Sequence, residues 1–225
     1  MTPGGRVAGQ FVTLEGVDGS GKSTVLSHLG QALAAQGYPV VLTREPGGTD
    51  IGRAIRAVLL DVESTGMSPL CEAMLYAADR AQHISEVIQP ALEAGNLVLC
   101  DRFTDSTIAY QSFGRGLERA WVEQLCEVAA DGLVPDKTLL LDLPVEEGFR
   151  RLAHRRATQD EGRREARLDE ETIAFHRRVY AGYRALAEAS PDRFVIVDAS
   201  RPVEEVVRAC LEVLAPLLAS VGAAS

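Results

Sequence analysis

Residues 16–23 read GVDGSGKS, and this stretch decides the fold class. It matches the pattern G-x-x-x-x-G-K-S, whose glycines let backbone N–H groups turn toward phosphate oxygens. The apolar run FVTLE at 11–15 precedes it, and a helical pattern from about 22 to 36 follows it. Strand, glycine-rich loop and helix in this order predict a P-loop that binds a nucleoside triphosphate. A chance glycine-rich turn is the competing interpretation, and pattern and context together disfavour it.

The side chains of the loop predict separate tasks. Lys22 has the reach for the β- and γ-phosphates, and Ser23 is a candidate ligand of Mg²⁺. The N-terminus of the following helix adds a partial positive charge. Asp18 is the unusual member, because phosphate repels a carboxylate, and a turn-stabilising aspartate is its simplest interpretation. The expected nucleotide-binding residues are Gly16, Val17, Asp18, Gly19, Ser20, Gly21, Lys22, Ser23 and Thr24.

The rest of the chain predicts an α/β fold with a parallel sheet. Four further apolar, strand-like runs alternate with helical patterns, and such alternation is typical of a parallel sheet covered by helices on both faces. These runs are 39–43, 97–101, 137–143 and 193–198. Because no linker or internal repeat interrupts the pattern, we expect one domain over residues 1–225.

Composition excludes several classes of function. The chain has 225 residues and a net charge of −9, which argues against general nucleic-acid binding. No apolar run reaches membrane-spanning length, and the apolar C-terminal stretch is expected to be an amphipathic helix packed on the domain. The start lacks the pattern of a signal peptide. The four scattered cysteines predict buried free thiols in a reducing cytoplasm, without a zinc site.

An arginine-rich segment, RRLAHRRATQDEGRREAR at 150–167, is the one break in composition. A solvated helix surface is its simplest interpretation. A mobile lid over about 150–168 that binds anions is the alternative, and an arginine cluster in an acidic protein favours it. Since no arginine occupies positions 17–20 of the P-loop, this segment is also where we expect the cation for phosphoryl transfer.

Three more stretches carry a family resemblance: TREPGGT at 43–49, YAADRAQH at 76–83 and DRFTDSTIAYQSFGRG at 101–116. Together with the P-loop they resemble bacterial thymidylate kinase over nearly the whole chain. The resemblance implies a P-loop NTPase fold with a five-stranded parallel sheet, and a homodimer that uses ATP with Mg²⁺. It also implies phosphoryl transfer to dTMP, giving dTDP and ADP for dTTP synthesis and DNA replication.

The resemblance assigns roles to individual residues. Arg102 corresponds to the arginine on the dTMP phosphate, and Asp101, with Ser23, to a group close to Mg²⁺. The implied acceptor-binding residues are Glu45, Pro46, Tyr76, Arg80, Arg102, Ser106, Thr107, Tyr110 and Gln111. Within this set Tyr76 stacks on the base, Arg80 hydrogen-bonds it, and Tyr110 crowds the sugar 2′ position. Thr107 and Gln111 read the base edge or line its pocket.

The catalytic residues that the resemblance implies are Lys22, Arg102, Asp18, Arg155 and Arg167. Asp18 is expected to face the acceptor 3′-hydroxyl or to pair with Arg102. The acceptor is itself a phosphate, so no strong general base is required, and the four histidines are interpreted as structural or surface residues. The sequence departs from the family pattern at Tyr76, where phenylalanine is commoner, and at Ala166, where the family has aspartate before the lid arginine.

Each side chain has a simpler interpretation. Tyr76 and Tyr110 could be core aromatics, and Arg80 a helix-surface residue paired with Asp79 or Glu86. Asp101 could cap the turn after its strand.

Two other functions also fit a P-loop. One is another small kinase, acting on a nucleoside or a different monophosphate. The other is a nucleotide-dependent switch or assembly ATPase that uses its basic segment to hold a protein partner. The TREPGGT and DRFTDSTIAYQ stretches favour the thymidylate kinase interpretation over both.

Overall fold

The computed structural model describes residues 9–158, 167–168 and 171–219. The strands are β1 (Gln10–Glu15), β2 (Val40–Arg44), β3 (Leu97–Asp101), β4 (Lys137–Asp142) and β5 (Phe194–Asp198). The α-helices are α1 (Lys22–Ala35), α2 (Asp50–Leu60), α3 (Pro69–His83), α4 (Gln89–Glu93), α5 (Thr104–Thr107), α6 (Arg119–Ala130), α7 (Val145–Thr158), α8 (Ile173–Ala189) and α9 (Val203–Leu218). Two π-helical segments, η1 (Ile84–Ile88) and η2 (Ile108–Gly114), continue α3 and α5.

The strands form one sheet in the order β2-β3-β1-β4-β5, and every pairing is parallel. The predicted five-stranded parallel sheet is therefore confirmed. β1 lies at the centre, where it pairs with β3 on one side and β4 on the other. The P-loop leaves the end of β1, so it begins between the carboxyl ends of its two neighbours. Ligands of open α/β sheets bind at this edge.

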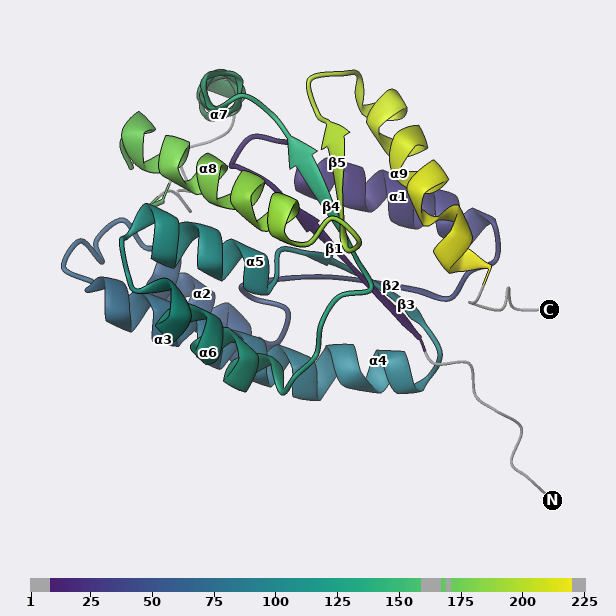
Figure 1. Ribbon diagram of the computed structural model, residues 1–225, viewed down its shortest axis with the longest axis horizontal. Coiled ribbons are helices and arrows are strands. Elements are labelled where there is room, and N and C mark those ends of the chain that lie inside the picture. The colour runs from purple at the N-terminus through teal and green to yellow at the C-terminus, as the bar shows by residue number, and fades with distance from the viewer. Residues whose placement is uncertain (1–8, 159–166, 169–170, 220–225) are drawn as a thin grey trace.

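Helices cover both faces of the sheet, as Figure 1 shows. Successive residues of a strand point to opposite faces. Val12 and Leu14 of β1 pack with α1 and α9, in a core that Leu99 of β3 also joins. Phe11 of β1 points to the other face, where Ile88 of η1 belongs to the same apolar cluster. Both faces of the central strands are therefore buried, which explains their unbroken apolar runs.

The edge strands differ from what their sequence predicts. Residues 39–43 are expected to form a buried strand, but β2 is an edge strand and Leu42 is 45% exposed. At the opposite edge Ile196 of β5 is 43% exposed. An apolar run shows that a strand faces apolar neighbours on at least one side. The strand order decides whether the strand lies at the edge of the sheet or is buried in its centre.

The helices follow local signals, with η2 as an exception. Ser68 caps α3 by accepting a hydrogen bond from the Cys71 N–H at 3.2 Å, and Pro69 begins the helix. Cys71 is nevertheless exposed, so the prediction that all four cysteines are buried is wrong at this position. The sequence has a helical pattern around 104–112, and the chain there forms α5 and then the π-helix η2, a form that often marks functional sites.

The C-terminal helix α9 packs its apolar side on the sheet and α1, as its pattern predicts. Across the described residues, every helix is too short or too polar to span a bilayer.

The P-loop and α7 meet backbone to backbone. A Cβ atom at Gly148 would lie 2.6 Å from the carbonyl oxygen of Asp18, and one at Gly19 would lie 2.4 Å from the carbonyl oxygen of Gly148. Real Cβ atoms do not approach so closely, so only glycine fits at either position. The loop is therefore held against the first turn of the helix that leads into the arginine-rich segment.

Gly182 tests the packing of α8 against η2, which places Tyr183 and Tyr110 at the sheet edge. A Cβ at Gly182 would lie 2.8 Å from the Phe113 ring. We expect Gly182→Val to lower the free energy of unfolding by about 1–3 kcal/mol through overpacking, measured by urea denaturation. Gly66→Ala, at a site with nothing within 4 Å, is the control. Equal stability of both variants would contradict this packing.

Candidate active site

The P-loop is shaped for an anion. Gly16, Gly19 and Gly21 have φ values of 140°, 81° and 90°, which side chains with a Cβ rarely adopt. Lys22 is buried, and its Nζ donates at 3.0 Å to the carbonyl oxygens of both Gly16 and Val17. Burial lowers the pKa of Lys22 to about 8, and Arg102 contributes to the shift. Ser20 is also buried, whereas Ser23 and Thr24 begin α1 with exposed side chains.

An ion pair joins this loop to the end of β3. Arg102 Nη2 donates to Asp18 Oδ1 at 2.6 Å, and the Tyr110 hydroxyl donates to Asp18 Oδ2 at 2.6 Å. Burial would raise the pKa of Asp18, but Arg102, Lys22 and the Tyr110 hydrogen bond lower it to about 2. Asp18 is therefore ionised at neutral pH and faces Arg102, one of its two expected arrangements.

The backbone of Arg102 is strained to make this contact. Its φ is 74°, in the left-handed region that costs a non-glycine residue about 1–2 kcal/mol. The Arg102 N–H donates to the Leu14 carbonyl at 3.0 Å, which holds the turn against β1. Such strain persists where surrounding contacts hold it, and it is common at functional sites.

Glu15 supports Arg102 indirectly, through two hydroxyl groups. This buried carboxylate accepts hydrogen bonds from Ser106 Oγ at 2.6 Å, the Tyr183 hydroxyl at 3.0 Å and the Phe103 N–H at 2.7 Å. Arg102 Nη1 donates to the same two hydroxyl groups, at 3.1 Å for Ser106 and 2.9 Å for Tyr183. The hydroxyls thus relay hydrogen bonds from the guanidinium to Glu15. Burial raises the pKa of Glu15 to about 7, and Asp105 adds to the shift.

The predicted cation ligands lie side by side. Ser23 Oγ donates to Asp101 Oδ2 at 2.7 Å. Asp101 Oδ1 is buried without a hydrogen-bond partner in the described part of the chain. An unpaired carboxylate oxygen beside a hydroxyl is the oxygen donor set that Mg²⁺ accepts, so these residues fit such an ion.

Among the predicted acceptor-binding residues, Arg80 is fully buried in α3, so its interpretation as a helix-surface residue is wrong. It donates to Glu45 Oε2 from Nε at 2.9 Å and to Thr107 Oγ1 from Nη2 at 3.0 Å. Glu45 is held on its other oxygen by His83 Nδ1 at 3.0 Å. Pro46 follows Glu45 through a cis peptide bond, and its carbonyl accepts from Arg56 at 2.9 Å.

A second carboxylate organises the other end of α3. Glu72 is 1% exposed and accepts hydrogen bonds from Gln111 Nε2 at 2.9 Å, from Arg115 and from Arg167. Tyr76 lies one helical turn from Glu72 and is partly buried. Burial raises the pKa of the Tyr76 hydroxyl, and Glu72 adds to this effect.

The arginine-rich segment is described only in part. Arg150 and Arg151 pair with Glu147 on the same helix, which agrees with a solvated helix surface for these two. The backbone of Arg155 belongs to α7, and its side chain lies outside the described residues. Arg167 donates to the Leu59 carbonyl at 2.6 Å and to Glu72, so the structure places it against α2 and α3.

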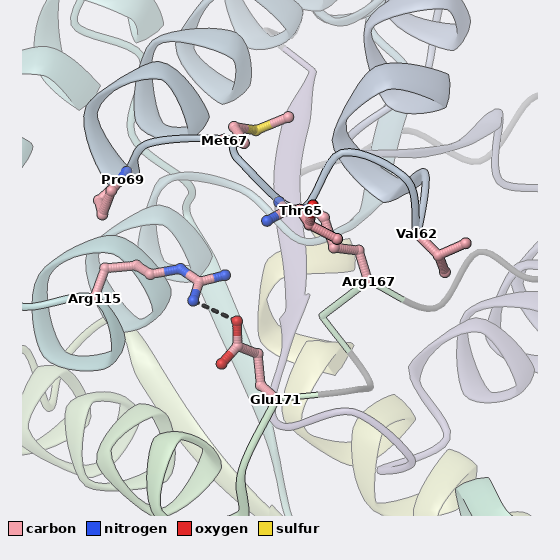
Figure 2. Close-up of a pocket in the computed structure, with 7 residues that line it drawn as sticks. All are labelled: Val62, Thr65, Met67, Pro69, Arg115, Arg167 and Glu171. Atoms are coloured by element: carbon pink, nitrogen blue, oxygen red, sulfur yellow. Dashed lines mark hydrogen bonds and ion pairs between the residues drawn. The ribbon is translucent and has the colours of Figure 1, made fainter.

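Arg115 and Arg167 border a cleft of about 390 Å³. Figure 2 shows the residues that line it, which include Glu171 and, from the loop between α2 and α3, Val62, Thr65 and Met67. Arg115 and Glu171 point toward one another and are ion-paired. The cleft therefore adjoins the network around Glu72.

Comparison with known proteins agrees with this geometry. Residues 14–210 match the family model of thymidylate kinase. The chain belongs to the thymidylate kinase family. The thymidylate kinase of Desulfovibrio desulfuricans is 54% identical over 200 residues, which cover 89% of this chain and 92% of that protein. The thymidylate kinase of Geotalea uraniireducens is 51% identical over 197 residues, covering 88% and 92%.

A solved structure extends the likeness to the fold. The crystal structure of thymidylate kinase from Ehrlichia chaffeensis superposes with a TM-score of 0.75 at 30% identity, and the match covers 92% of this chain and 99% of that one. The resemblance drawn from TREPGGT and DRFTDSTIAYQ, and the fold it implied, are thus confirmed.

Sequence reasoning missed three residues of this thymidylate kinase site: Glu15, Glu72 and Tyr183. Two of them left a signal. Glu15 is a lone acid at the end of an apolar strand directly before the P-loop, and Glu72 precedes Tyr76 and Arg80 at four-residue spacing on one helix face. Tyr183 had no local signal, because its partners Glu15 and Arg102 are far away in the sequence.

Glu15 makes the stability depend on pH in a predictable way. Its pKa is about 7 when folded and near 4.5 when unfolded, so the folded protein binds this proton more tightly. Its stabilising contribution is present below pH 4.5 and is lost as the pH rises to about 7. We expect the free energy of unfolding of Glu15→Gln, relative to that of the wild type, to increase between pH 5 and 7 and then to stay constant. Urea denaturation at each pH measures this difference. If the difference in free energy of unfolding between the two proteins does not change from pH 5 to 8, the pKa of Glu15 is not raised in the folded protein.

Proposed function

We propose that the chain carries out the reaction of its family, the transfer of the γ-phosphoryl group of ATP to dTMP, giving dTDP and ADP. The observation that carries this proposal is the contact between Arg102 and Asp18. It puts a fixed guanidinium from the acceptor side next to the donor P-loop. An acceptor phosphate bound by Arg102 would then face the γ-phosphate of ATP.

On the donor side, the backbone N–H groups of 16–23 and the N-terminus of α1 hold the phosphates of ATP. We propose that Lys22 exchanges its two carbonyl contacts for phosphate oxygens when ATP arrives. Ser23 and Asp101 are the residues that hold Mg²⁺, which would neutralise phosphate charge when bound.

On the acceptor side, Arg102 binds the dTMP phosphate, and Ser106 keeps the guanidinium in place. The base lies against Tyr76, between Arg80 with Thr107 at one end and Gln111 at the other. Tyr110 borders the sugar 2′ position while its hydroxyl holds Asp18. Glu45 keeps Arg80 in place, and Pro46 follows it in the same loop beside the acceptor. All these roles follow from the family, and the contacts support them.

The chemistry requires positioning and charge neutralisation more than proton transfer. Two anionic substrates must approach, and Lys22, Arg102 and a lid arginine offset their charge. We propose Arg155 for that lid cation. Arg167, held by Glu72 and Leu59, would either leave these partners during closure or act as the anchor of the lid.

The ionised state of Asp18 balances Arg102 before dTMP binds. We propose that its carboxylate also accepts a hydrogen bond from the sugar 3′-hydroxyl when dTMP is bound. No residue needs to act as a strong general base, because the attacking group is already an ionised phosphate.

Two further properties complete the proposal. The protein would be a homodimer, because the neighbouring helices α2, α3 and α6 carry five exposed apolar side chains: Ile51, Val58, Leu70, Met74 and Val128. It would be a single domain working in the cytoplasm on small molecules, and its four free cysteines agree with a reducing compartment.

The function is tested by ADP release with dTMP, dUMP, dCMP, AMP, GMP and thymidine as acceptors. We expect dTMP to give the highest kcat/KM, and Lys22→Ala to reduce kcat by at least about 100-fold, because transition-state charge loses a fixed partner. Lys137→Ala, a lysine of β4 whose Nζ binds the Asp192 carbonyl, is the matched control and should keep its activity. Faster turnover of thymidine than of dTMP, or ATP hydrolysis that no acceptor stimulates, would overturn the proposal.

The dimer is tested by sedimentation equilibrium. The wild type should have twice the mass of one chain, and Met74→Glu should shift it to the monomer because a charge enters the apolar face. Val134→Glu is the control, since Val134 is exposed but lies outside the three helices. A monomeric wild type would rule out the homodimer, and a dimeric Met74→Glu would place the interface elsewhere.

A further inference from the structure

Glu72 is a buried carboxylate that the proposed reaction does not use. Its Oε1 accepts from Gln111 Nε2 at 2.9 Å and Arg115 Nε at 3.0 Å, and its Oε2 accepts from Arg115 Nη2 at 3.0 Å and Arg167 Nη2 at 2.5 Å. Both oxygens are thus fully engaged. A carboxylate with this many donors, 1% exposed, is held in one orientation.

The charges around Glu72 keep it ionised. Burial would raise its pKa, but Arg115, Gln111 and Arg167 lower it. Arg115 also pairs with Glu171, so the network contains two guanidinium groups and two carboxylates. Figure 2 shows Arg115, Arg167 and Glu171 at the cleft that borders this network. An ionised carboxylate accepts hydrogen bonds and cannot donate them.

This property fixes the orientation of the Gln111 side chain. An amide has an NH₂ group that donates and an oxygen that accepts. Because Glu72 only accepts, the NH₂ group of Gln111 must face it. The reversed amide would bring two oxygen acceptors together in a buried place, where an unsatisfied contact is costly. The oxygen of Gln111 is therefore the atom that remains to accept a hydrogen bond from a ligand.

Residues of α3 face residues of α5 and η2, and their contacts place this oxygen relative to Arg80. Glu72, Tyr76 and Arg80 follow one another at four-residue spacing on α3. Thr107 of α5 contacts Arg80, and Gln111 of η2 contacts Glu72. The two contacts mark the ends of the shared face, and Tyr76 lies between them on α3. The face thus carries a pure donor, Arg80, at one end and a fixed acceptor, Gln111, at the other.

We infer that Glu72 is a positioning residue that makes Gln111 an acceptor and so restricts the pocket to pyrimidines with a hydrogen on N3. This inference rests on the proposed function, which places the base on this face. Thymine and uracil offer a carbonyl oxygen at position 4 and an N3–H, which complement a donor followed by an acceptor. Cytosine offers an amino group and an unprotonated N3. Its amino group would place a donor against the donor Arg80, and its N3 an acceptor against the oxygen of Gln111.

The inference is tested by Glu72→Gln, with kcat/KM measured for dTMP and dCMP. A neutral amide at position 72 can donate to the oxygen of Gln111, so Gln111 is free to turn its NH₂ group toward the base. We expect the ratio of kcat/KM for dTMP to that for dCMP to fall about 10-fold or more, with dUMP following dTMP. A merely structural role would reduce all three acceptors together and leave the ratio unchanged, which would overturn the inference.

Glu171→Gln is the matched control. It makes the same change in a carboxylate that pairs with Arg115 and does not contact Gln111. Its dTMP-to-dCMP ratio should stay within about 2-fold of the wild type; a drop equal to that of Glu72→Gln would overturn the inference.

Gln111→Met provides a test that does not depend on the folding of Glu72→Gln. It removes the acceptor itself, and the ratio should fall by a similar factor. Combined with Glu72→Gln it should give little further loss, because both changes act on one atom. An unchanged ratio in Gln111→Met would overturn the inference even if dTMP remains the best acceptor. A wild type that does not use dTMP would instead refute the proposed function.

Discussion

The ion pair between Arg102 and Asp18 is the contact on which the site depends. It joins the P-loop after β1 to the end of β3 across 2.6 Å, and both side chains are mostly shielded from water. A buried charge is costly unless it is paired and hydrogen-bonded. The surrounding hydroxyls of Ser106, Tyr110 and Tyr183 supply those bonds. The backbone of Arg102 is strained at this position, and the pair holds the P-loop and the end of β3 in one fixed relation.

Three buried carboxylates share one physical task. Glu15 fixes the hydroxyls behind Arg102, Glu45 fixes Arg80, and Glu72 fixes Gln111. Each accepts hydrogen bonds and so determines which way a neighbouring polar group must point. The site is therefore organised largely by buried carboxyl groups that orient its cationic and hydroxyl side chains. This arrangement also explains how a chain with a net charge of −9 can hold an anion-binding site.

Much of the fold could be predicted from the sequence, because its signals are local. The P-loop, the five apolar strands and the family stretches lie in short windows. Strand order could not be predicted, since an apolar run at 39–43 reads the same at the centre or the edge of a sheet. The contacts of Glu72 with Arg167 and of Glu15 with Tyr183 join residues 95 and 168 positions apart. Periodicity carries no record of such pairs, and only the folded chain reveals them.

The glycine pair at positions 19 and 148 limits which segments could be exchanged between this chain and related proteins. Because each leaves no room for a Cβ on the other segment, the two backbones form a seam without side chains. A graft that replaced α7 with the corresponding helix of a relative would fail if it brought any other residue to position 148. The P-loop and this helix therefore constrain each other's sequence, although 128 residues separate their facing glycines.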